Sequence, residues 1–532
     1  MRSFKFATYT LGCKVSQYES VALAEELERL GLEEVDFSEY ADAYIINTCT
    51  VTQESDAKSR KYIRRALRKN PGAVIAVMGC YSQRSPDEVA AIDGVSIVAG
   101  TADKMKIAPM IVELLSKKAS HSGRGSAAGD EEKKASHSGR GGTEGDGEKK
   151  ASHFGRGGTV GDGEGRTQAG RYSSGGDRYM PSPTGSESLP LSGKGDRFAV
   201  DEELSGKSDE TISSPPYIPI IITKSLEGEA FEPMCITRPE RTRAYVKIED
   251  GCECRCTYCA IADARGPVRS KPVTDVISEV EGLYKNGTKE IVLTGIETGS
   301  YGADFTEKYD LGDLIAELDK RGSCERIRLG SLAPELIGEK FIAKVGKTKI
   351  LAPHFHLSMQ SGSDSVLRRM KRRYNTEMAL RNISIIRDAF PDATFTTDLM
   401  VGFPGETEED FLDTINFVSK ARFLDCHVFA YSRRDGTPAA TYPDQVPEDV
   451  KKKRSEMLIE EKNKVRDSVL SEICDRGEPL SCIFENKRRG FWISHSDTFV
   501  EVRVESDLDL SGKLVSVVPR EVSDGVIYGK LL

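Results

Sequence analysis

The 532-residue sequence lacks any long apolar run. Its longest candidates, residues 73–79 and 217–222, fall far short of the ~18 residues that a membrane-spanning helix needs. The opening segment, MRSFKFATYTLGCK, contains no apolar stretch typical of a secretory signal. We therefore expect a soluble cytoplasmic protein without a membrane partner.

Apolar residues are also scarce, at 38% with a single tryptophan, and positive charge is not in excess. The net charge is −9, from 75 Lys and Arg against 84 Asp and Glu. This balance argues against a generic polyanion binder, although local basic patches could still contact nucleic acid. The 12 cysteines of a cytoplasmic chain favour metal binding or redox chemistry over a disulfide framework.

The shortage of apolar residues is concentrated in residues 117–230, which contain 22 of the 49 glycines and no cysteine. A 16-residue period repeats there, with KKASHSGRG beginning at Lys117 and Lys133 and KKASHFGRG at Lys149. A histidine tract can bind metal, but each copy has one histidine among Gly, Ser and Lys, and nothing preorganises a site. We therefore expect a low-complexity, disordered insert over 117–230.

Strand and helix patterns alternate on both sides of the insert, which predicts an α/β protein. In residues 3–116 the expected strands form a parallel sheet, and in residues 235–466 six strand–helix units predict a partial (βα)6 barrel. Residues 467–532 predict a small β-barrel-like tail. The expected strands are 4–10, 43–47, 73–78 and 95–99, then 244–248, 290–293, 326–329, 354–357, 393–400 and 427–430, then 480–485, 498–505, 513–519 and 526–531.

Four cysteines crowd the loop after the expected strand 244–248, in the stretch CECRCTYC. Cys252, Cys256 and Cys259 have CxxxCxxC spacing, and three thiolates on one loop can hold three irons of a 4Fe–4S cube. The fourth iron then has no protein ligand, which leaves an open site for chemistry. With Cys254 the loop could instead offer four thiolates to zinc, but four ligands within eight residues would strain a tetrahedral site.

A second set of cysteines follows three expected strands of the first region. Cys13, Cys49 and Cys80 each come just after the C-terminal end of a strand. Because these ends share one edge of a parallel sheet, the three thiols could converge. A lone buried cysteine is usually inert packing, but three at equivalent strand ends, each beside Gly or Thr, predict a second cluster.

Together these features resemble the methylthiotransferases, a subfamily of the radical S-adenosylmethionine enzymes. The resemblance covers the whole chain except 117–230 and implies an N-terminal domain with three cysteines, a radical barrel and a C-terminal TRAM β-barrel that binds RNA. Its motifs are TLGCKVSQYES from Thr10, INTCTVT from Ile46, LTGI from Leu293, QSGSD from Gln360 and VGFPGET from Val401.

The resemblance implies two 4Fe–4S clusters and S-adenosylmethionine as cofactors. Cys252, Cys256 and Cys259 would hold the cluster at which S-adenosylmethionine is cleaved to a radical. The other trio, Cys13, Cys49 and Cys80, would hold an auxiliary cluster that carries the methylthio group. An unactivated C–H bond offers no acidic proton, so a cofactor radical must act and we expect no catalytic residue beyond the ligands. An electron donor such as flavodoxin or ferredoxin, and a monomer, are expected.

The expected contacts to S-adenosylmethionine are less specific. Tyr258 matches an aromatic position near the adenine in the family, with ordinary loop packing as the alternative. Thr294 and Gly295 end an expected strand, where a plain turn is the alternative. Departures from the family pattern, at Ser16, at AIADARG after Cys259 and at Ala333-Pro334, leave the cysteines intact but affect these finer contacts. The remaining expected contacts are Glu297, Gln360 and Ser361.

Basic residues gather at two places beside the expected active edge, where phosphate contact is favoured over a merely solvated face. A third run, 451–454, is expected to be a solvated face. In the tail, basic residues followed by Phe491 and Trp492 suit RNA stacking. The expected RNA contacts are Arg60, Arg64, Arg65 and Arg68 on the helix 53–69, and Arg369, Arg372 and Arg373 after the QSGSD motif.

The opening motif is most similar to the subgroup that acts on N6-threonylcarbamoyladenosine at position 37 of tRNA, whereas the isopentenyladenosine subgroup more often has YGCQ there. We therefore expect an enzyme that converts this nucleoside to its 2-methylthio form. One alternative is the same chemistry on isopentenyladenosine-37 or on an aspartate of a ribosomal protein. The other is a non-catalytic iron–sulfur protein that binds RNA or senses redox state.

Overall fold

The computed structural model describes residues 3–50, 53–122, 218–239 and 242–532. The described residues up to Leu115 and from residue 218 onward belong to one compact unit. The part of the expected insert between residues 123 and 217 lies outside the described residues. Among the described helices, none is long and apolar enough to cross a membrane.

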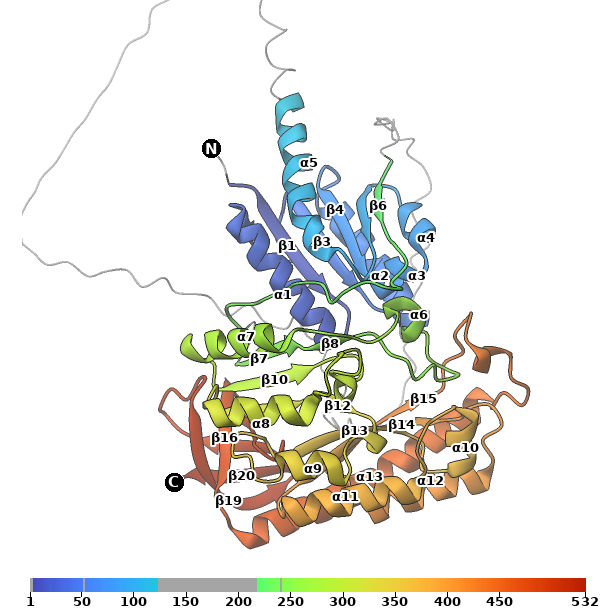
Figure 1. The fold of residues 1–532 in the computed structure, drawn as a ribbon, viewed down its shortest axis with the longest axis vertical. Coiled ribbons are helices and arrows are strands. Elements are labelled where there is room, and N and C mark those ends of the chain that lie inside the picture. The colour runs from blue at the N-terminus through green and yellow to red at the C-terminus, as the bar shows by residue number, and fades with distance from the viewer. Residues whose placement is uncertain (1–2, 51–52, 123–217, 240–241) are drawn as a thin grey trace, which may run out of the picture. The chain divides into compact units, whose positions relative to one another are not determined.

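The N-terminal region forms a six-stranded parallel sheet in the order β2-β1-β3-β4-β5-β6 (Figure 1). Every residue of β3, β4 and β5 is buried, as expected for a parallel sheet covered on both faces. Helices α1 and α5 pack on one face, and α2 and α4 pack on the other. The strands are β1 (Lys5–Thr10), β2 (Glu33–Glu34), β3 (Ala43–Thr48), β4 (Val74–Gly79), β5 (Val95–Ala99) and β6 (Ile220–Ile222), and the helices are α1 (Lys14–Arg29), α2 (Gln53–Lys69), α3 (Cys80–Arg84), α4 (Pro86–Ala90) and α5 (Ile107–Ser122).

Strand β6 lies inside the range that we assigned to the insert. Its three isoleucines pair with Ile97–Ala99 of β5 and complete the edge of the sheet. Just after β6, Lys224 makes ion pairs with Asp103 and Glu229, and Leu226 is buried. The chain therefore rejoins the folded N-terminal region at residue 220, ten residues before the expected boundary, because β-branched side chains there fit an edge strand.

The central region forms the expected partial barrel from two parallel sheets, in the orders β11-β10-β7 and β12-β13-β14-β15. Outside the named strand pairs, Ile327 forms a single parallel bridge with Leu351. The strands are β7 (Arg243–Lys247), β10 (Glu290–Thr294), β11 (Arg326–Leu329), β12 (Ser331–Leu332), β13 (His354–Gln360), β14 (Thr394–Val401) and β15 (Asp425–Ala430), with the short pair β8 (Glu249–Asp250) and β9 (Arg269–Ser270). The helices are α6 (Ile261–Arg265), α7 (Val273–Lys285), α8 (Leu311–Arg321), α9 (Glu339–Val345), α10 (Asp364–Arg369), α11 (Thr376–Ala389) and α12 (Glu408–Ala421).

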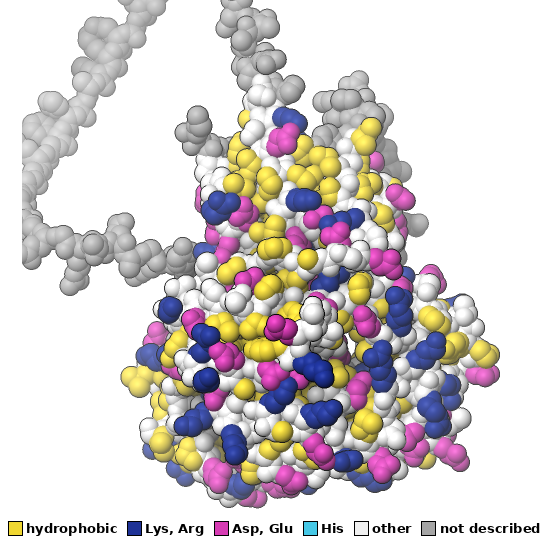
Figure 2. Space-filling view, viewed as in Figure 1, with side chains coloured by type: hydrophobic (Ala, Val, Ile, Leu, Met, Phe, Trp, Pro, Cys, Tyr) yellow, Lys and Arg dark blue, Asp and Glu magenta, His cyan; other side chains and the backbone are white. Residues whose placement is uncertain are grey.

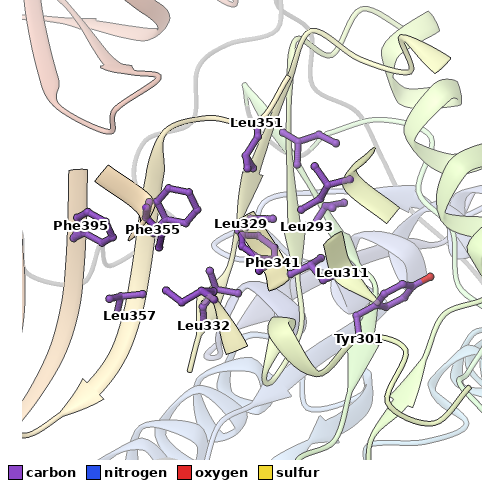
Figure 3. Packing of buried hydrophobic residues seen from close by; sticks show 14 of the residues in the cluster. Leu293, Tyr301, Leu311, Leu329, Leu332, Phe341, Leu351, Phe355, Leu357 and Phe395 are labelled. Atoms are coloured by element: carbon purple, nitrogen blue, oxygen red, sulfur yellow. The ribbon is translucent and has the colours of Figure 1, made fainter. Parts of the chain in front are cut away.

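Apolar side chains between the barrel strands and helices form the largest core of the described residues (Figure 3). Leu293, Leu329 and Phe355 come from three different strands and are fully buried together. Burial of each such side chain stabilises the fold by about 1.5–3 kcal/mol. Local signals agree with this packing, since reciprocal capping boxes begin α8 at Asp310 and α12 at Thr407.

The C-terminal region consists of the long helix α13 (Glu448–Arg476) and a closed five-stranded barrel in the order β16-β17-β18-β20-β19. Four of these strands were expected, but β17 (Phe491–Ser496) was not. Its inward positions include Ser494 and Ser496, so the strand lacks the apolar alternation that would predict it from the sequence. Both hydroxyls are satisfied inside the barrel, by Val502 O and Thr498 Oγ1. The other strands are β16 (Leu480–Arg488), β18 (Glu501–Glu505), β19 (Leu514–Ser523) and β20 (Val526–Leu531).

The position of β6 predicts how the insert can be shortened. Replacing residues 123–217 by a flexible Gly–Ser linker should leave the melting temperature and the activity unchanged, because no described contact is lost. Deleting 117–230 also removes β6 and the buried Leu226 and should cost at least about 2 kcal/mol of unfolding free energy. Thermal and urea unfolding of both proteins test this, and equal stability of the two deletions would contradict it.

Candidate active site

The first trio of cysteines lies at one edge of the N-terminal sheet. Thr48 at the end of β3 is paired with Gly79 at the end of β4, and the next residues are Cys49 and Cys80. Cys13 follows β1 and is the N-cap residue of α1. A Cβ at Gly79, whose φ is +105°, would meet backbone and side-chain atoms at 2.6 Å, so the turn before Cys80 requires glycine. The strand register therefore brings all three cysteines to one edge.

The second trio lies on the loop between β8 and α6. The backbone N–H of Thr257 donates to Met370 O at 3.1 Å, and its hydroxyl donates to Arg369 O at 2.9 Å. Arg372 Nη1 donates to Cys256 Sγ at 3.2 Å, and the N–H of Ile261 donates to Cys259 Sγ at 3.4 Å. Burial raises the pKa of the Cys259 thiol to about 11. The segment after α10 thus fixes the middle of this loop.

The two trios are neighbours in the fold. Arg265 ends the short helix α6, six residues after Cys259, and its Nε donates to Cys80 Sγ at 3.3 Å. The contact joins a side chain from the loop of the second trio to a thiol of the first. It was not foreseen from the sequence, in which Arg265 was only part of a stretch that departs from the family pattern.

Within the described residues, no three His, Cys, Asp or Glu side chains are grouped as a ready-made metal site. The donor set nevertheless fits iron–sulfur clusters, because each trio consists of soft thiol ligands on one loop or one sheet edge. In addition, a guanidinium contacts a thiol of each trio, Arg265 at Cys80 and Arg372 at Cys256. Burial raises the pKa of the Cys80 thiol, and the Arg265 guanidinium opposes that rise, which assists the thiolate form that cluster ligation requires.

The expected S-adenosylmethionine contacts lie at the C-terminal ends of barrel strands. Thr294 ends β10 and is buried, and a Cβ at Gly295 would meet Glu249 Oε2 at 2.4 Å. Glu297 is buried, donates its N–H to Glu249 Oε2 at 2.9 Å and accepts the N–H of Ala333 through Oε1 at 2.9 Å. Burial raises the pKa of Glu297 to about 8 and that of Glu249 well above its usual range. This corner holds two carboxyl groups that burial favours in the neutral form.

The other three expected contacts differ in their surroundings. Gln360 ends β13 with φ of +68°, a conformation that non-glycine residues rarely adopt and that often marks a functional site. Ser361 is buried, and its hydroxyl accepts the N–H of Ser363 at 3.2 Å and lies 3.5 Å from Thr414 Oγ1. Tyr258 is half-buried against the apolar cluster that includes Met370 and Phe403. Ser361 therefore supports the turn, and Tyr258 packs next to the cysteine loop.

A polar group on three adjacent barrel strands was missed from the sequence. Asp398 of β14 lies 3.2 Å from His356 Nε2 of β13 and 3.3 Å from His427 Nδ1 of β15. The other ring nitrogen of His356 lies 2.9 Å from Thr396 Oγ1. The signal for this group was the recurrence of His and Thr or Asp at every second residue of β13 and β14, which puts them on one face of the sheet.

The expected RNA-contacting arginines fall into two classes. Arg64, Arg65 and Arg68 are exposed on α2, and Arg373 is exposed after α10. Arg60 donates to Tyr81 Oη, Arg369 pairs with Asp410, and both are half-buried. Over the face drawn in Figure 2, Lys and Arg side chains are interspersed with Asp and Glu.

Arg372 has a different place from the other arginines. Its guanidinium donates to Cys256 Sγ, to Tyr374 Oη at 2.8 Å and to Ser358 O at 2.8 Å. All three nitrogens are therefore engaged within the protein, around the cysteine loop. The geometry favours a role at this loop over the RNA contact that we expected from the sequence.

Two family models match the chain. The model described as the radical SAM superfamily matches residues 246–418, and the model described as the uncharacterized protein family UPF0004 matches residues 5–100. The chain is also 33% identical over 519 residues to the threonylcarbamoyladenosine tRNA methylthiotransferase MtaB of Bacillus subtilis, with 96% of this chain and 92% of that protein covered. The chain belongs to the radical SAM methylthiotransferases. Its cofactors are accordingly S-adenosylmethionine and 4Fe–4S clusters, as the resemblance implied.

This methylthiotransferase is also similar to one further tRNA-modifying relative and to one solved structure. It is 27% identical over 535 residues to the tRNA-2-methylthio-N6-dimethylallyladenosine synthase of Acetivibrio thermocellus, with 98% of this chain and 90% of that protein covered. Among solved structures, a radical S-adenosylmethionine methyltransferase from Kitasatospora setae is 13% identical with a TM-score of 0.47, over 82% of this chain and 77% of that one.

The polar group of the methylthiotransferase barrel predicts a titration. The pKa of His427 should lie above 6.5, because a hydrogen bond to Asp398 favours the protonated ring. The stabilisation of the fold by protonated His427 should therefore be complete below a pH of about 6.5. It should be lost as the pH rises through the folded-state pKa of His427. NMR of histidine-labelled protein measures this, and Asp398→Asn should lower the His427 pKa. His354, whose pKa burial holds well below 6.5, should stay neutral in both proteins.

Proposed function

We propose that this enzyme converts N6-threonylcarbamoyladenosine at position 37 of tRNA to its 2-methylthio derivative. The contact that carries the proposal is the hydrogen bond from Arg265 Nε to Cys80 Sγ at 3.3 Å, because it puts the two cysteine trios beside one another. Two-cluster chemistry requires this arrangement, since radical formation and sulfur transfer must reach one substrate carbon. The TLGCKVSQYES opening and the similarity to the Bacillus subtilis protein support the choice of nucleoside.

We assign Cys252, Cys256 and Cys259 to the cluster that binds S-adenosylmethionine, and Cys13, Cys49 and Cys80 to the auxiliary cluster. When bound, these groups supply a carbon-centred radical and a methylthio group. The chain's own residues orient the ligands: Arg372 holds Cys256, and Arg265 holds Cys80. Thr294 ends β10, Gly295 and Glu297 follow it, and Gln360 ends β13, and we assign these four residues to S-adenosylmethionine. Tyr258 shields the loop from water on its apolar side.

The tRNA contacts are assigned to exposed basic residues of α2 and to Arg373. Helix α2 begins four residues after Cys49, and Arg64, Arg65 and Arg68 are exposed on its later turns, which lead to the start of β4 at the opposite edge of the sheet. There they can meet phosphates away from the cysteine edge. Arg373 adds a charge beside the second trio, and its Nη2 donates to Glu253 O at 3.0 Å. We assign the N-terminal region to the auxiliary cluster, the partial barrel to radical chemistry and the closed barrel to RNA. A cytoplasmic monomer that receives electrons from flavodoxin or ferredoxin completes the proposal.

The nucleoside assignment predicts one change in cellular tRNA. Deleting the gene should remove 2-methylthio-N6-threonylcarbamoyladenosine and leave its unmethylthiolated precursor in its place, as measured by nucleoside mass spectrometry. Loss of the methylthio-isopentenyl nucleoside instead would keep the family and reject the substrate. If no nucleoside changes, modification of a ribosomal-protein aspartate becomes the better hypothesis.

The two cysteine trios should separate two activities. Cys256→Ala should reduce both 5′-deoxyadenosine formation and methylthiolation below detection, because both need the radical. Cys13→Ala should abolish methylthiolation and leave reductive cleavage of S-adenosylmethionine measurable. Cys235→Ala, an exposed cysteine outside both trios, is the matched control and should behave as wild type. Full methylthiolation by Cys13→Ala would reject the auxiliary cluster assignment.

A further inference from the structure

A group of charged side chains is buried where the N-terminal sheet meets the partial barrel. Glu19 of α1 and Lys104, which begins a short 3-10 turn, come from the N-terminal region. Lys247, Asp250 and Arg265 come from the barrel side, at the ends of β7, β8 and α6. All five are buried, and the side chains of Glu19, Lys104 and Arg265 are wholly inaccessible to solvent.

Ion pairs connect every member of this group. Arg265 Nη1 lies 2.6 Å from Glu19 Oε1 and 3.2 Å from Asp250 Oδ1. Lys247 Nζ lies 2.8 Å from Glu19 and 2.6 Å from Asp250, and Lys104 Nζ lies 3.1 Å from Glu19. Arg265 Nη2 also donates to Glu19 Oε2 at 3.3 Å, and Nε donates to Cys80 Sγ at 3.3 Å. Arg265 is therefore held by two carboxylates on one side and contacts a thiol on the other.

The charges of this group do not balance. Arg269 also approaches Asp250, at 3.5 Å, so four cations share the two carboxylates of Glu19 and Asp250. Among the described residues, no further carboxylate lies within ion-pair distance of these cations. Glu19 and Asp250 therefore each face more than one basic side chain. Unpaired positive charge is costly in a protein interior, and the site calls for a further anion.

The thiols beside Arg265 indicate what that anion is. Three thiolates outweigh the dipositive core of an oxidised 4Fe–4S cluster, so the ligated cluster is an anion, and reduction makes it more negative. Cys80 is in direct contact with the guanidinium, and Cys13 and Cys49 lie at the same sheet edge. Positive charge fixed next to a cluster favours its reduced form.

We propose that Arg265 is a positioning residue whose guanidinium, held in place by Glu19 and Asp250, raises the reduction potential of the auxiliary cluster at Cys13, Cys49 and Cys80. The inference rests on the proposed assignment of that trio. It adds that a barrel residue controls a cluster of the N-terminal region. The same ion pairs hold the two regions together, so cluster charge and domain packing depend on one another.

The test isolates the auxiliary cluster in the full-length chain. Cys252→Ala, Cys256→Ala and Cys259→Ala together remove the other cluster's ligands, and anaerobic reconstitution then loads the remaining site. Iron and sulfide analysis measures loading, and a redox titration followed by electron paramagnetic resonance measures the midpoint potential. In this background Arg265→Gln should make the reduction equilibrium at least about tenfold less favourable, a shift of about 59 mV to more negative potential for a one-electron couple.

The opposite sign is expected for Glu19→Gln. That variant removes a buried negative charge at 2.6 Å from the guanidinium and should shift the midpoint to more positive potential. Glu19→Gln also provides a second measurement of the midpoint potential if Arg265→Gln binds little of the cluster. Lys271→Met is the matched control, because Lys271 is a buried cation at the same joint that pairs with Glu279 and has no described contact with a cysteine of either trio. It should lower stability and leave the potential unchanged.

The outcomes separate the inference from the proposed function. Shifts of opposite sign for Arg265→Gln and Glu19→Gln, with none for Lys271→Met, support it. Equal potentials in all loaded variants, or shifts of the same sign, overturn the role of Arg265 and leave the cluster assignment standing. If the triple cysteine variant binds no iron even with Arg265 present, the auxiliary cluster assignment fails, and the inference fails with it.

Discussion

The buried ion pair of Arg265 with Glu19 joins the two parts of the protein that carry the cysteine trios, and Asp250 holds the same guanidinium from the barrel side. Buried charges require well-placed partners, so this contact tolerates little displacement of the sheet relative to the barrel. A second buried contact at the same joint, from Tyr18 to Glu279 and Met234 O, adds to the constraint. The edge with Cys80 is consequently held beside α6, the helix that follows the loop with Cys256.

The opposite end of the barrel is closed by the C-terminal domain. Arg326 and Arg328 of β11 share Glu290 of β10 and also donate to backbone carbonyls of Ser481 and Ser496. Phe499 stacks on His354 at the start of β13, with ring centroids 4.4 Å apart. These contacts lie at the N-terminal ends of the barrel strands. The C-terminal domain therefore packs at the end of the barrel strands opposite to the cysteine loop.

Local sequence signals predicted most of the elements, because they depend on neighbours in the chain. The apolar runs of β3 and β4, the capping residues of α8 and α12 and the CxxxCxxC loop are all readable within a few residues. Strand β17 was missed because Ser494 and Ser496 occupy its inward positions, and the return of the chain at β6 was missed beside a glycine-rich segment. In both cases the fold supplies partners that the sequence cannot show, namely the barrel interior and the free edge of β5.

The sequence by itself determined the α/β class, the cysteine motifs and the family, since these follow from composition, periodicity and short motifs. Only the tertiary structure decided which side chains surround the thiols. Arg265 reaches Cys80 across 185 positions of sequence, and Arg372 reaches Cys256 across 116. The grouping of His356, Asp398 and His427 depends on the register of three parallel strands. Contacts of this kind arise from packing between distant segments, so a local pattern can place side chains on one face of a strand but does not select their partners.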